Sequence, residues 1–337
     1  METLIERLRR QAQAPPVFAA ELIASLKMVL RADFEAYASE HRQRTGQTAC
    51  AWIPTVMGTG SPLSARYGAR PDPAALPEII LTNQLFSVLT TDAARDVAGS
   101  GLWEPLPVTG THPAFAGTWD SAPEAYHLLA ACPYVFLIDR KQLGGEPEPR
   151  CWSDLTDARF RGRICINGTK YGPDASILLW LYRRFGSDWL EELRPNVVSS
   201  MHGSAMARNI GTGRNGNIAV YLSTAFFAYA HGEDELVRVV WPEDAAPFQP
   251  CVLLAKLGAG EKYSWIIDYL MGERFAAILN QNWYPTAAPW DTSPLEAGMK
   301  LDWFGWELLL DPDTPRLSEE LRELFRQAAR PGERRKP

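Results

Sequence analysis

The chain has 337 residues, a length that suits two domains better than one. Because 46% of the residues are hydrophobic, the chain has enough apolar side chains for packed cores, which excludes a disordered protein. The net charge of −6 and the scattered basic residues argue against nucleic acid or an anionic membrane surface as the main partner.

The N-terminal region predicts helices. Residues 2–45 carry apolar side chains at helical spacing, and Pro15-Pro16 separates two segments. The apolar stretch at 18–30 is interrupted by charges, so it lacks the uninterrupted run of roughly 7–15 residues that a signal peptide needs. No stretch approaches the roughly 20 apolar residues of a membrane span. We therefore expect a cytoplasmic protein without membrane insertion, or a periplasmic one if a signal segment was removed.

The first half of the chain predicts several buried strands. Apolar runs bounded by turn residues occur at 50–56, 78–82 and 103–108. The longest apolar run, 126–138, is interrupted at Cys132-Pro133, and we interpret it as one strand followed by another at 135–138.

Strands and helices then alternate, which is typical of a mostly parallel sheet with crossover helices. The predicted strands are 164–167, 197–200, 218–222, 237–241 and 251–255. The predicted helices are 175–185, 204–210, 224–231, 263–271, 274–280 and, in the C-terminal tail, 318–328.

Five cysteines are isolated from one another, and none shows the CxxC spacing of a metal or redox site. Cys132, Cys165 and Cys251 sit inside apolar runs, so we expect them to be buried free thiols.

Several segments, taken in order, resemble the iron(III)-type branch of the extracellular solute-binding proteins of ABC transporters. The resemblance runs over about 48–290 and rests on VFLIDR (135–140), PEPRCWSDL (147–155), FRGRICI (160–166), WPEDA (241–245) and the helical stretch 265–279 before NWYP (282–285).

The resemblance implies a fold class: an α/β, two-lobed, type 2 periplasmic-binding-protein-like fold with mixed, mostly parallel sheets and an N-terminal helical extension at 1–45. Lobe 1 would comprise 46–134 plus 242–295 and lobe 2 would comprise 135–241, while 296–337 would form a helical tail. Ligand would bind between the lobes, where loops after strands present helix N-termini to polar or anionic groups.

Polar residues that follow the predicted strands are the candidate ligand contacts, and each has a structural alternative as a turn or helix cap. The candidates are Thr59, Gly60 and Ser61, then Asn83, then Thr169, Asp174, Ala175 and Ser176, then His202 and Ser204, and finally Ser223, with Tyr126 at the start of the longest apolar run.

Phe226 and Phe227 argue against iron(III) as the ligand. At the matching point the iron(III) proteins carry adjacent tyrosines that bind the metal, whereas phenylalanine has no oxygen to offer a hard cation. The pair is either core or an apolar wall against an organic ligand. We therefore predict no metal and no other cofactor.

The sequence thus predicts a protein that binds a small organic or anionic solute, as an ABC-type solute-binding protein or a non-secreted relative. Its partners would be the small molecule and, if the protein is exported, an ABC permease. Two alternatives remain: a cytosolic ligand sensor or carrier, and an enzyme in which His202 and Asp174 act on the ligand. No catalytic motif favours the enzyme.

Overall fold

The computed structural model describes residues 16–22, 24–54, 62–83, 91–108, 110–169, 171–232 and 234–328. The chain divides into two compact units. Unit 1 comprises Met1–His112, Trp119–Ala131 and Pro250–Ser293, and unit 2 comprises Pro113–Thr118, Cys132–Gln249 and Pro294–Pro337.

Unit 1 is built on a mixed sheet. Strand β1 (Phe18–Glu21) lies between β2 (Ala51–Trp52) and β3 (Ile79–Thr82) and pairs with both in parallel. The unit 1 part of β11 (Ala246–Lys256) runs antiparallel to β3 and to β4 (Trp103–Glu104). Because all four residues of β1 are buried, this short strand forms the centre of the unit 1 core.

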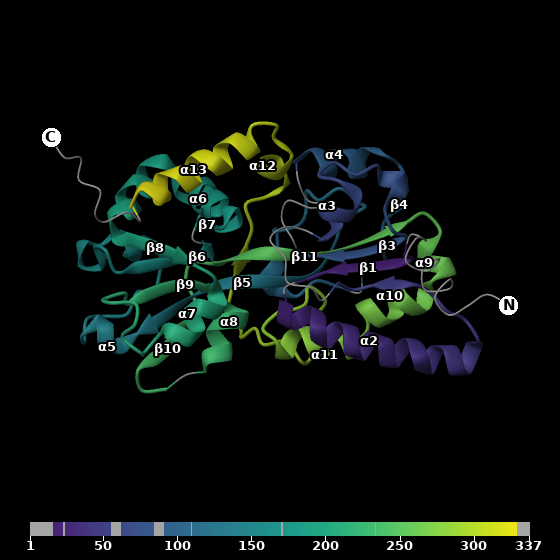
Figure 1. Ribbon diagram of the computed structural model, residues 1–337, viewed down its shortest axis with the longest axis horizontal. Coiled ribbons are helices and arrows are strands. Elements are labelled where there is room, and N and C mark those ends of the chain that lie inside the picture. Colours follow the sequence, from purple (N-terminus) through teal and green to yellow (C-terminus); the bar gives the residue numbers. More distant parts are fainter. Residues whose placement is uncertain are drawn as a thin grey trace. The chain divides into compact units, whose positions relative to one another are not determined.

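Aromatic side chains attach helices to one face of this sheet. Phe34 of α2 (Ala24–Thr45) packs 5.0 Å from Phe18 of β1 and 5.9 Å from Trp265 of α10 (Ser264–Met271), measured between ring centres. Figure 1 shows α2 and α10 on the same side of the strands. The other helices of unit 1 are α3 (Pro62–Tyr67), the 3₁₀ turn η1 (Pro73–Ala75), α4 (Thr91–Gly99), α9 (Ala259–Lys262) and α11 (Glu273–Gln281).

The prediction of helix throughout 2–45 is wrong at 18–21. Helix α2 begins at Ala24, whereas Phe18–Glu21 form strand β1. The apolar residues of the segment fit both periods over so short a stretch, and hydrogen bonding to two neighbouring strands decides for the strand.

Unit 2 has a second mixed sheet. Strand β6 (Ile164–Thr169) pairs in parallel with β8 (Val197–Met201) on one side and with β9 (Val220–Thr224) on the other. The unit 2 part of β5 (His127–Asp139) is antiparallel to β9 and to β10 (Val237–Val240). Two short strands complete the unit: β7 (Gly172–Pro173), paired with β6, and β12 (Leu301–Asp302), paired with β11.

Helix α6 (Ala175–Leu193) carries the largest side chains of the unit 2 core. Its Trp180 packs edge-on against the fully buried Trp152 and donates a hydrogen bond to Asp302. The other helices are α5 (Arg140–Leu143), α7 (Gly203–Asn209), α8 (Ala225–His231), α12 (Trp306–Leu310), α13 (Thr314–Ala328) and the 3₁₀ turns η2 (Pro113–Phe115), η3 (Trp152–Thr156), η4 (Ala158–Phe160) and η5 (Arg194–Asn196).

The longest apolar run forms one strand rather than the two that we expected. Strand β5 continues through Cys132-Pro133, although proline has no amide to donate. The pairing partners change at this point: Ala131 donates to the carbonyl of Pro285, and the register with β9 begins at Tyr134 opposite Thr224. The missing amide therefore falls where the strand changes neighbours.

The predicted strands at 50–56 and 103–108 are shorter in the structure, at Ala51–Trp52 and Trp103–Glu104. The cysteine prediction is confirmed, because Cys132, Cys165 and Cys251 are free and buried. Within the described ranges, no helix has both the length and the apolar character required to cross a bilayer.

Candidate functional site

Three parallel strands of unit 2 end at the same edge of its sheet. Asn167 of β6 lies beside Met201 of β8, and Ile166 lies beside Leu222 of β9. Helices α6, α7 and α8 follow these strands. In open α/β sheets ligands bind at the carboxyl ends of the strands. This edge carries the predicted residues Thr169, Asp174, Ala175, Ser176, His202, Ser204 and Ser223.

A tight hairpin returns the chain to the end of β6. Gly168 pairs with Pro173, and the amide of Asp174 donates to the carbonyl of Asn167 over 2.9 Å. A Cβ atom on Gly168 would lie 2.4 Å from the carbonyl oxygen of Gly172, so this approach requires glycine. The backbone therefore holds Asp174 beside Asn167.

Five polar side chains meet here, and we name them the Asp174 cluster: Tyr134, Asn167, Asp174, Ser176 and Gln249. Asp174 Oδ2 lies 2.5 Å from Asn167 Nδ2 and 3.4 Å from the Tyr134 hydroxyl. The Tyr134 hydroxyl lies 3.0 Å from Ser176 Oγ. Gln249 Nε2 donates to both hydroxyls, over 2.7 Å to Tyr134 and 3.0 Å to Ser176.

Burial sets the electrostatics of the cluster. It raises the pKa of Tyr134 well above its ordinary value, and the neighbouring Asp174 charge acts in the same direction, so Tyr134 remains a hydroxyl donor. Burial also raises the pKa of Asp174, and the hydrogen bonds from Asn167 and Tyr134 offset part of this effect. Asp174 occupies the N-cap position that we predicted, but its carboxylate does not cap α6.

His202 caps α7 with a defined tautomer. Its Nδ1 accepts the backbone amide of Ser204 over 3.2 Å and lies 2.9 Å from the Ser204 hydroxyl. Because a backbone amide only donates, Nδ1 carries no proton, and Nε2–H is the donor of the neutral ring. Phe227 packs edge-on against His202, with ring centres 5.0 Å apart. Phe226 and Phe227 are both half-buried, and their rings pack edge-on against each other with centres 4.9 Å apart.

The end of β9 adds two buried hydroxyls. Ser223 is fully buried and Thr224 is 4% exposed, and neither hydroxyl has a hydrogen-bond partner among the described residues. Thr224 lies opposite Tyr134 in the sheet, so it adjoins the Asp174 cluster. Thr224 also occupies the N-cap position of α8, but its side chain forms no capping hydrogen bond with the helix. Unpaired buried hydroxyls next to a polar cluster are typical of a binding site.

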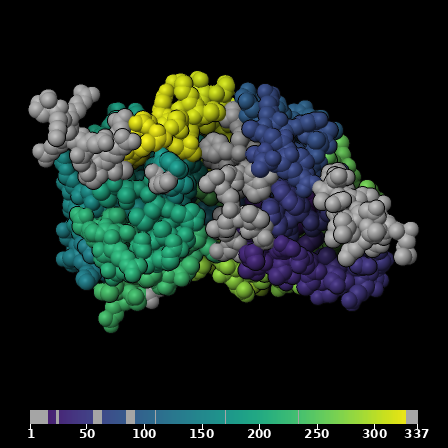
Figure 2. Space-filling model, viewed as in Figure 1, coloured from purple at the N-terminus to yellow at the C-terminus, as the bar shows by residue number. Residues whose placement is uncertain are grey.

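Helix α13 supports the hairpin from the other side. Arg326 donates to the carbonyl of Tyr171, and Arg322 lies close enough to influence the charge of Asp174. Figures 1 and 2 show α13, in yellow, running along this part of unit 2. The predicted C-terminal helix is therefore part of unit 2 and contacts the segment that carries the cluster.

The remaining predicted residues lie elsewhere or have local roles. Thr169 is exposed, and its hydroxyl accepts the amide of Tyr171. In unit 1, Asn83 is 3% exposed and donates to the Tyr284 hydroxyl over 3.4 Å, while Tyr126 is buried and donates to the carbonyl of Ala94. Thr59, Gly60 and Ser61 lie outside the described residues.

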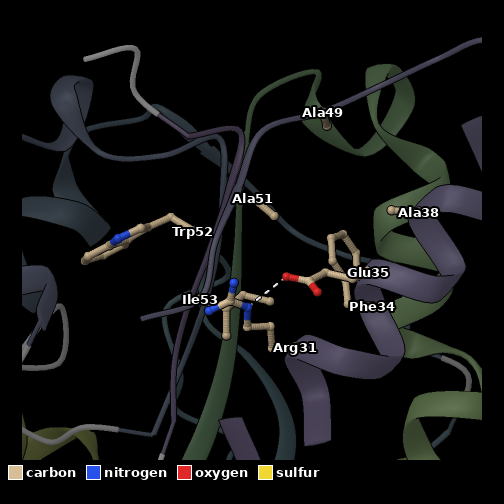
Figure 3. A pocket seen from close by; sticks show the side chains of 8 residues that line it. All are labelled: Arg31, Phe34, Glu35, Ala38, Ala49, Ala51, Trp52 and Ile53. Carbon is tan, nitrogen blue, oxygen red and sulfur yellow. Dashed lines mark hydrogen bonds and ion pairs between the residues drawn. The ribbon is translucent and has the colours of Figure 1, made fainter. Parts of the chain in front are cut away.

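Unit 1 has a shallow pocket between α2 and β2 (Figure 3). Arg31 and Glu35, the two charged residues that line it, pair with each other over 2.8 Å. The rest of the lining is Phe34, Ala38, Ala49, Ala51, Trp52 and Ile53, and none of the predicted residues takes part. Because its two charged residues pair with each other and the other lining residues are apolar, this pocket offers fewer groups for binding a polar ligand than the Asp174 cluster does.

Sequence reasoning missed Tyr134, Asn167 and Gln249. Tyr134 and Asn167 lie within apolar strands, and Gln249 lies between Phe248 and Pro250 in β11. A polar residue inside an otherwise buried strand is the signal that would have found the first two.

The chemistry of the described side chains does not favour a metal. Within the described part of the chain, no group of three or more His, Cys, Asp or Glu side chains is arranged to hold a metal ion. Phe226 and Phe227 carry no donor atom. The edge instead offers one carboxylate surrounded by amides and hydroxyls, groups that can form hydrogen bonds with a polar molecule.

The sequence matches a known protein family. Residues 74–311, well over half of the chain, match the sequence model of a family described as bacterial extracellular solute-binding proteins. No protein with a curated description matches the sequence.

Solved structures with the same fold are similar over nearly their whole length. The spermidine/putrescine ABC transporter substrate-binding protein PotD of Streptococcus pneumoniae is 12% identical with a TM-score of 0.62, covering 94% of this chain and 100% of that one. The ferric iron-binding protein A of Mannheimia haemolytica is 12% identical with a TM-score of 0.61, covering 94% and 98%. The AfuA protein of Actinobacillus pleuropneumoniae, solved with fructose 6-phosphate, is 16% identical with a TM-score of 0.57, covering 93% and 97%. These likenesses show the two-lobed periplasmic-binding-protein fold.

Proposed function

Because this chain belongs to the bacterial extracellular solute-binding protein family, we propose that the Asp174 cluster of unit 2 is where it binds a small organic solute. The observation that carries the proposal is an unpaired acceptor inside a built site. Asn167 is 7% exposed, and its Oδ1 has no hydrogen-bond partner among the described residues. A buried acceptor without a donor costs about 1–3 kcal/mol, which a bound solute would recover.

The position of the cluster supports the same proposal. It lies at the carboxyl ends of parallel strands, beside the capped N-terminus of α7 and the hydroxyls of Ser223 and Thr224. Solved structures with this fold include a spermidine/putrescine substrate-binding protein, a ferric iron-binding protein and a protein with bound fructose 6-phosphate. The cluster of this chain, with one carboxylate among neutral groups, fits an organic molecule better than it fits iron.

The family description supports a role outside the cytoplasm, with delivery of the solute to an ABC permease. The cytosolic sensor or carrier is the rival. Fractionation of cells that express the natural gene distinguishes them: protein in the periplasmic or membrane-anchored fraction supports delivery, and protein confined to the cytosol supports the sensor.

A thermal-shift screen of the full chain against metabolites, followed by titration calorimetry of the hits, tests solute binding. A ligand that binds only the folded state raises the melting temperature by mass action. We expect Asn167→Ala to lower the affinity for a hit at least tenfold. Asn209→Ala, at the other end of α7, is the matched control and should bind normally. Equal affinity of both variants would place the binding site elsewhere.

A further inference from the structure

The direction of each hydrogen bond in the Asp174 cluster can be assigned from chemistry. The amide nitrogen of Gln249 only donates, and its two protons point at the Tyr134 and Ser176 hydroxyls. Tyr134 donates to Asp174, so Ser176 is the donor in its bond with Tyr134. The protons thus run from Gln249 through the two hydroxyls to Asp174 Oδ2.

Asn167 closes the network from the other side. Its amide nitrogen faces the same carboxylate oxygen, because two oxygens at 2.5 Å would repel each other if Asp174 is ionised. Asp174 Oδ2 therefore receives two donors, from Asn167 and from Tyr134. The side-chain protons of Gln249, Tyr134 and Ser176 therefore all bond to other members of the cluster.

What the cluster leaves for a solute is chiefly a set of acceptors, since one N–H of the Asn167 amide is the proton that this network does not use. Asn167 Oδ1 is buried and unpaired, and Asp174 Oδ1 accepts no hydrogen bond from a described residue. The carbonyl oxygen of Gln249 belongs to an amide whose nitrogen is already engaged. One of these acceptors carries a negative charge at a partly buried position, where a solute cation would replace the lost hydration.

Resting on the proposed function, we propose that the solute presents a cationic hydrogen-bond donor, an ammonium or guanidinium group, to Asp174 and Asn167. The geometry is consistent with the pKa of Asp174, which burial raises and which the hydrogen bonds from Asn167 and Tyr134 lower only in part, so a solute cation would stabilise the carboxylate further. An anion is the principal rival, since the first amides of α6 are not capped by Asp174. The carboxylate at that helix end would repel it.

The test is a thermal-shift panel on the full chain with three charge classes. Primary amines and guanidines, such as agmatine and ethanolamine, represent cations; neutral sugars and polyols form the second class; phosphates and carboxylates form the third. We expect the hits, measured by calorimetry, to come from the first class. Hits only among anions or neutral compounds that still depend on Asn167 would overturn this inference and leave the proposed function standing. No hit in any class, or hits indifferent to Asn167, would overturn both.

A variant pair on α6 and its N-cap sharpens the test. Asp174→Asn keeps the shape and removes the charge, so we expect cation affinity to fall at least tenfold, since a charge-assisted hydrogen bond is roughly twice as strong as a neutral one. Asp188→Asn, an exposed position on the same helix, should leave affinity unchanged. If Asp174→Asn does not fold, the affinity of the unaltered protein for ethanolamine is compared with that for its neutral isostere ethylene glycol, and we expect the cation to bind at least tenfold more tightly. Equal affinity for the two compounds, or persistence of cation binding in folded Asp174→Asn, contradicts the proposal.

Discussion

Each unit carries a carboxylate at the carboxyl ends of its parallel strands, but the two carboxylates are used differently. Glu21 at the end of β1 is 1% exposed, and each of its oxygens accepts a donor from the protein: the Thr82 hydroxyl over 3.2 Å and the Leu63 amide over 3.3 Å. Asp174 in unit 2 is half-buried, and both of its donors meet one oxygen.

Under our proposal, the same strand-end position serves structure in unit 1 and recognition in unit 2. Glu21 joins β1, β3 and the start of α3, so its hydrogen bonds are internal and complete. The hairpin and the hydrogen bonds of the cluster hold Asp174, and its Oδ1 accepts no hydrogen bond from a described residue. A complete set of partners predicts a structural role, and an incomplete set predicts a ligand.

The largest effect should come from Gly168, because the hairpin of unit 2 brings two stretches of backbone into direct contact there. In Gly168→Ala the new Cβ would collide with backbone atoms of Gly172 and Pro173, which cannot rotate away. We expect a loss of about 3 kcal/mol or more in the free energy of unfolding, together with loss of solute binding. Urea denaturation measures it. Gly99→Ala, where nothing lies within 4 Å, is the control and should change little.

The next largest effect should separate the two carboxylates. Glu21→Ala leaves the Thr82 hydroxyl without its carboxylate acceptor and the Leu63 amide without a partner, so we expect it to destabilise the protein by about 2–3 kcal/mol. Solute affinity, measured by calorimetry on the protein that remains folded, should be unchanged. Asp174→Asn, which keeps an oxygen for its two donors, should show the reverse pattern, with weak binding and little loss of stability. A Glu21→Ala protein that is stable but does not bind would reverse the roles that we assign.

A smaller effect is expected at Gly203, the first residue of α7. A Cβ there would lie 2.3 Å from the ring of Phe227, which is half-buried and free to move by a few tenths of an ångström or more. We expect Gly203→Ala to destabilise the protein by about 1–2 kcal/mol and to weaken solute binding several-fold, since the ring of Phe227 packs against His202. Phe227→Leu in the same background should restore part of the stability. Failure of this rescue would contradict the clash as the cause.

The smallest expected effect is a gain in stability rather than a loss. Burial raises the pKa of Asp174 in the folded protein, so the protonated form is favoured there and ionisation opposes folding. The stability contribution of the proton is present below the ordinary pKa of aspartate, about 3.9, and is lost as the pH rises through the raised value. Without solute, Asp174→Asn should therefore melt slightly higher than the wild type at pH 7.

The difference in melting temperature should disappear as the pH falls toward 4. Tyr134 of β5, His202 of α7 and Arg322 of α13 face Asp174 in both proteins, so their contributions largely cancel in the comparison. A melting temperature of Asp174→Asn below that of the wild type at pH 7 would show that the ionised carboxylate stabilises the empty site.

Much of this organisation follows from local patterns in the sequence. The alternation of strands and helices after residue 160 predicted β6, β8, β9 and the helices that follow them, because each strand is a short apolar run bounded by turn residues. Polar residues after parallel strands share one edge by geometry, which brings Asp174, Ser176, His202 and Ser223 together.

The parts that escaped prediction depend on contacts between distant segments. Strand β1 is a strand because β2 and β3 pair with it, and four residues carry too little periodicity to show this. Tyr134 and Gln249 are 115 positions apart and meet only through the fold. The unpaired oxygen of Asn167 is visible only once all its neighbours are known.

The distribution of the five cysteines makes the protein easy to label. Cys50 is exposed, three others are buried, and Cys151 is half-buried with a thiol pKa that burial raises. Because the thiolate is the reactive form, a maleimide dye or spin label should attach to Cys50 first, without removal of any native cysteine. A second thiol introduced at Asp188 would place a partner label on α6. Each unit would then carry one label, and the environment of each label could be followed separately while solute is added.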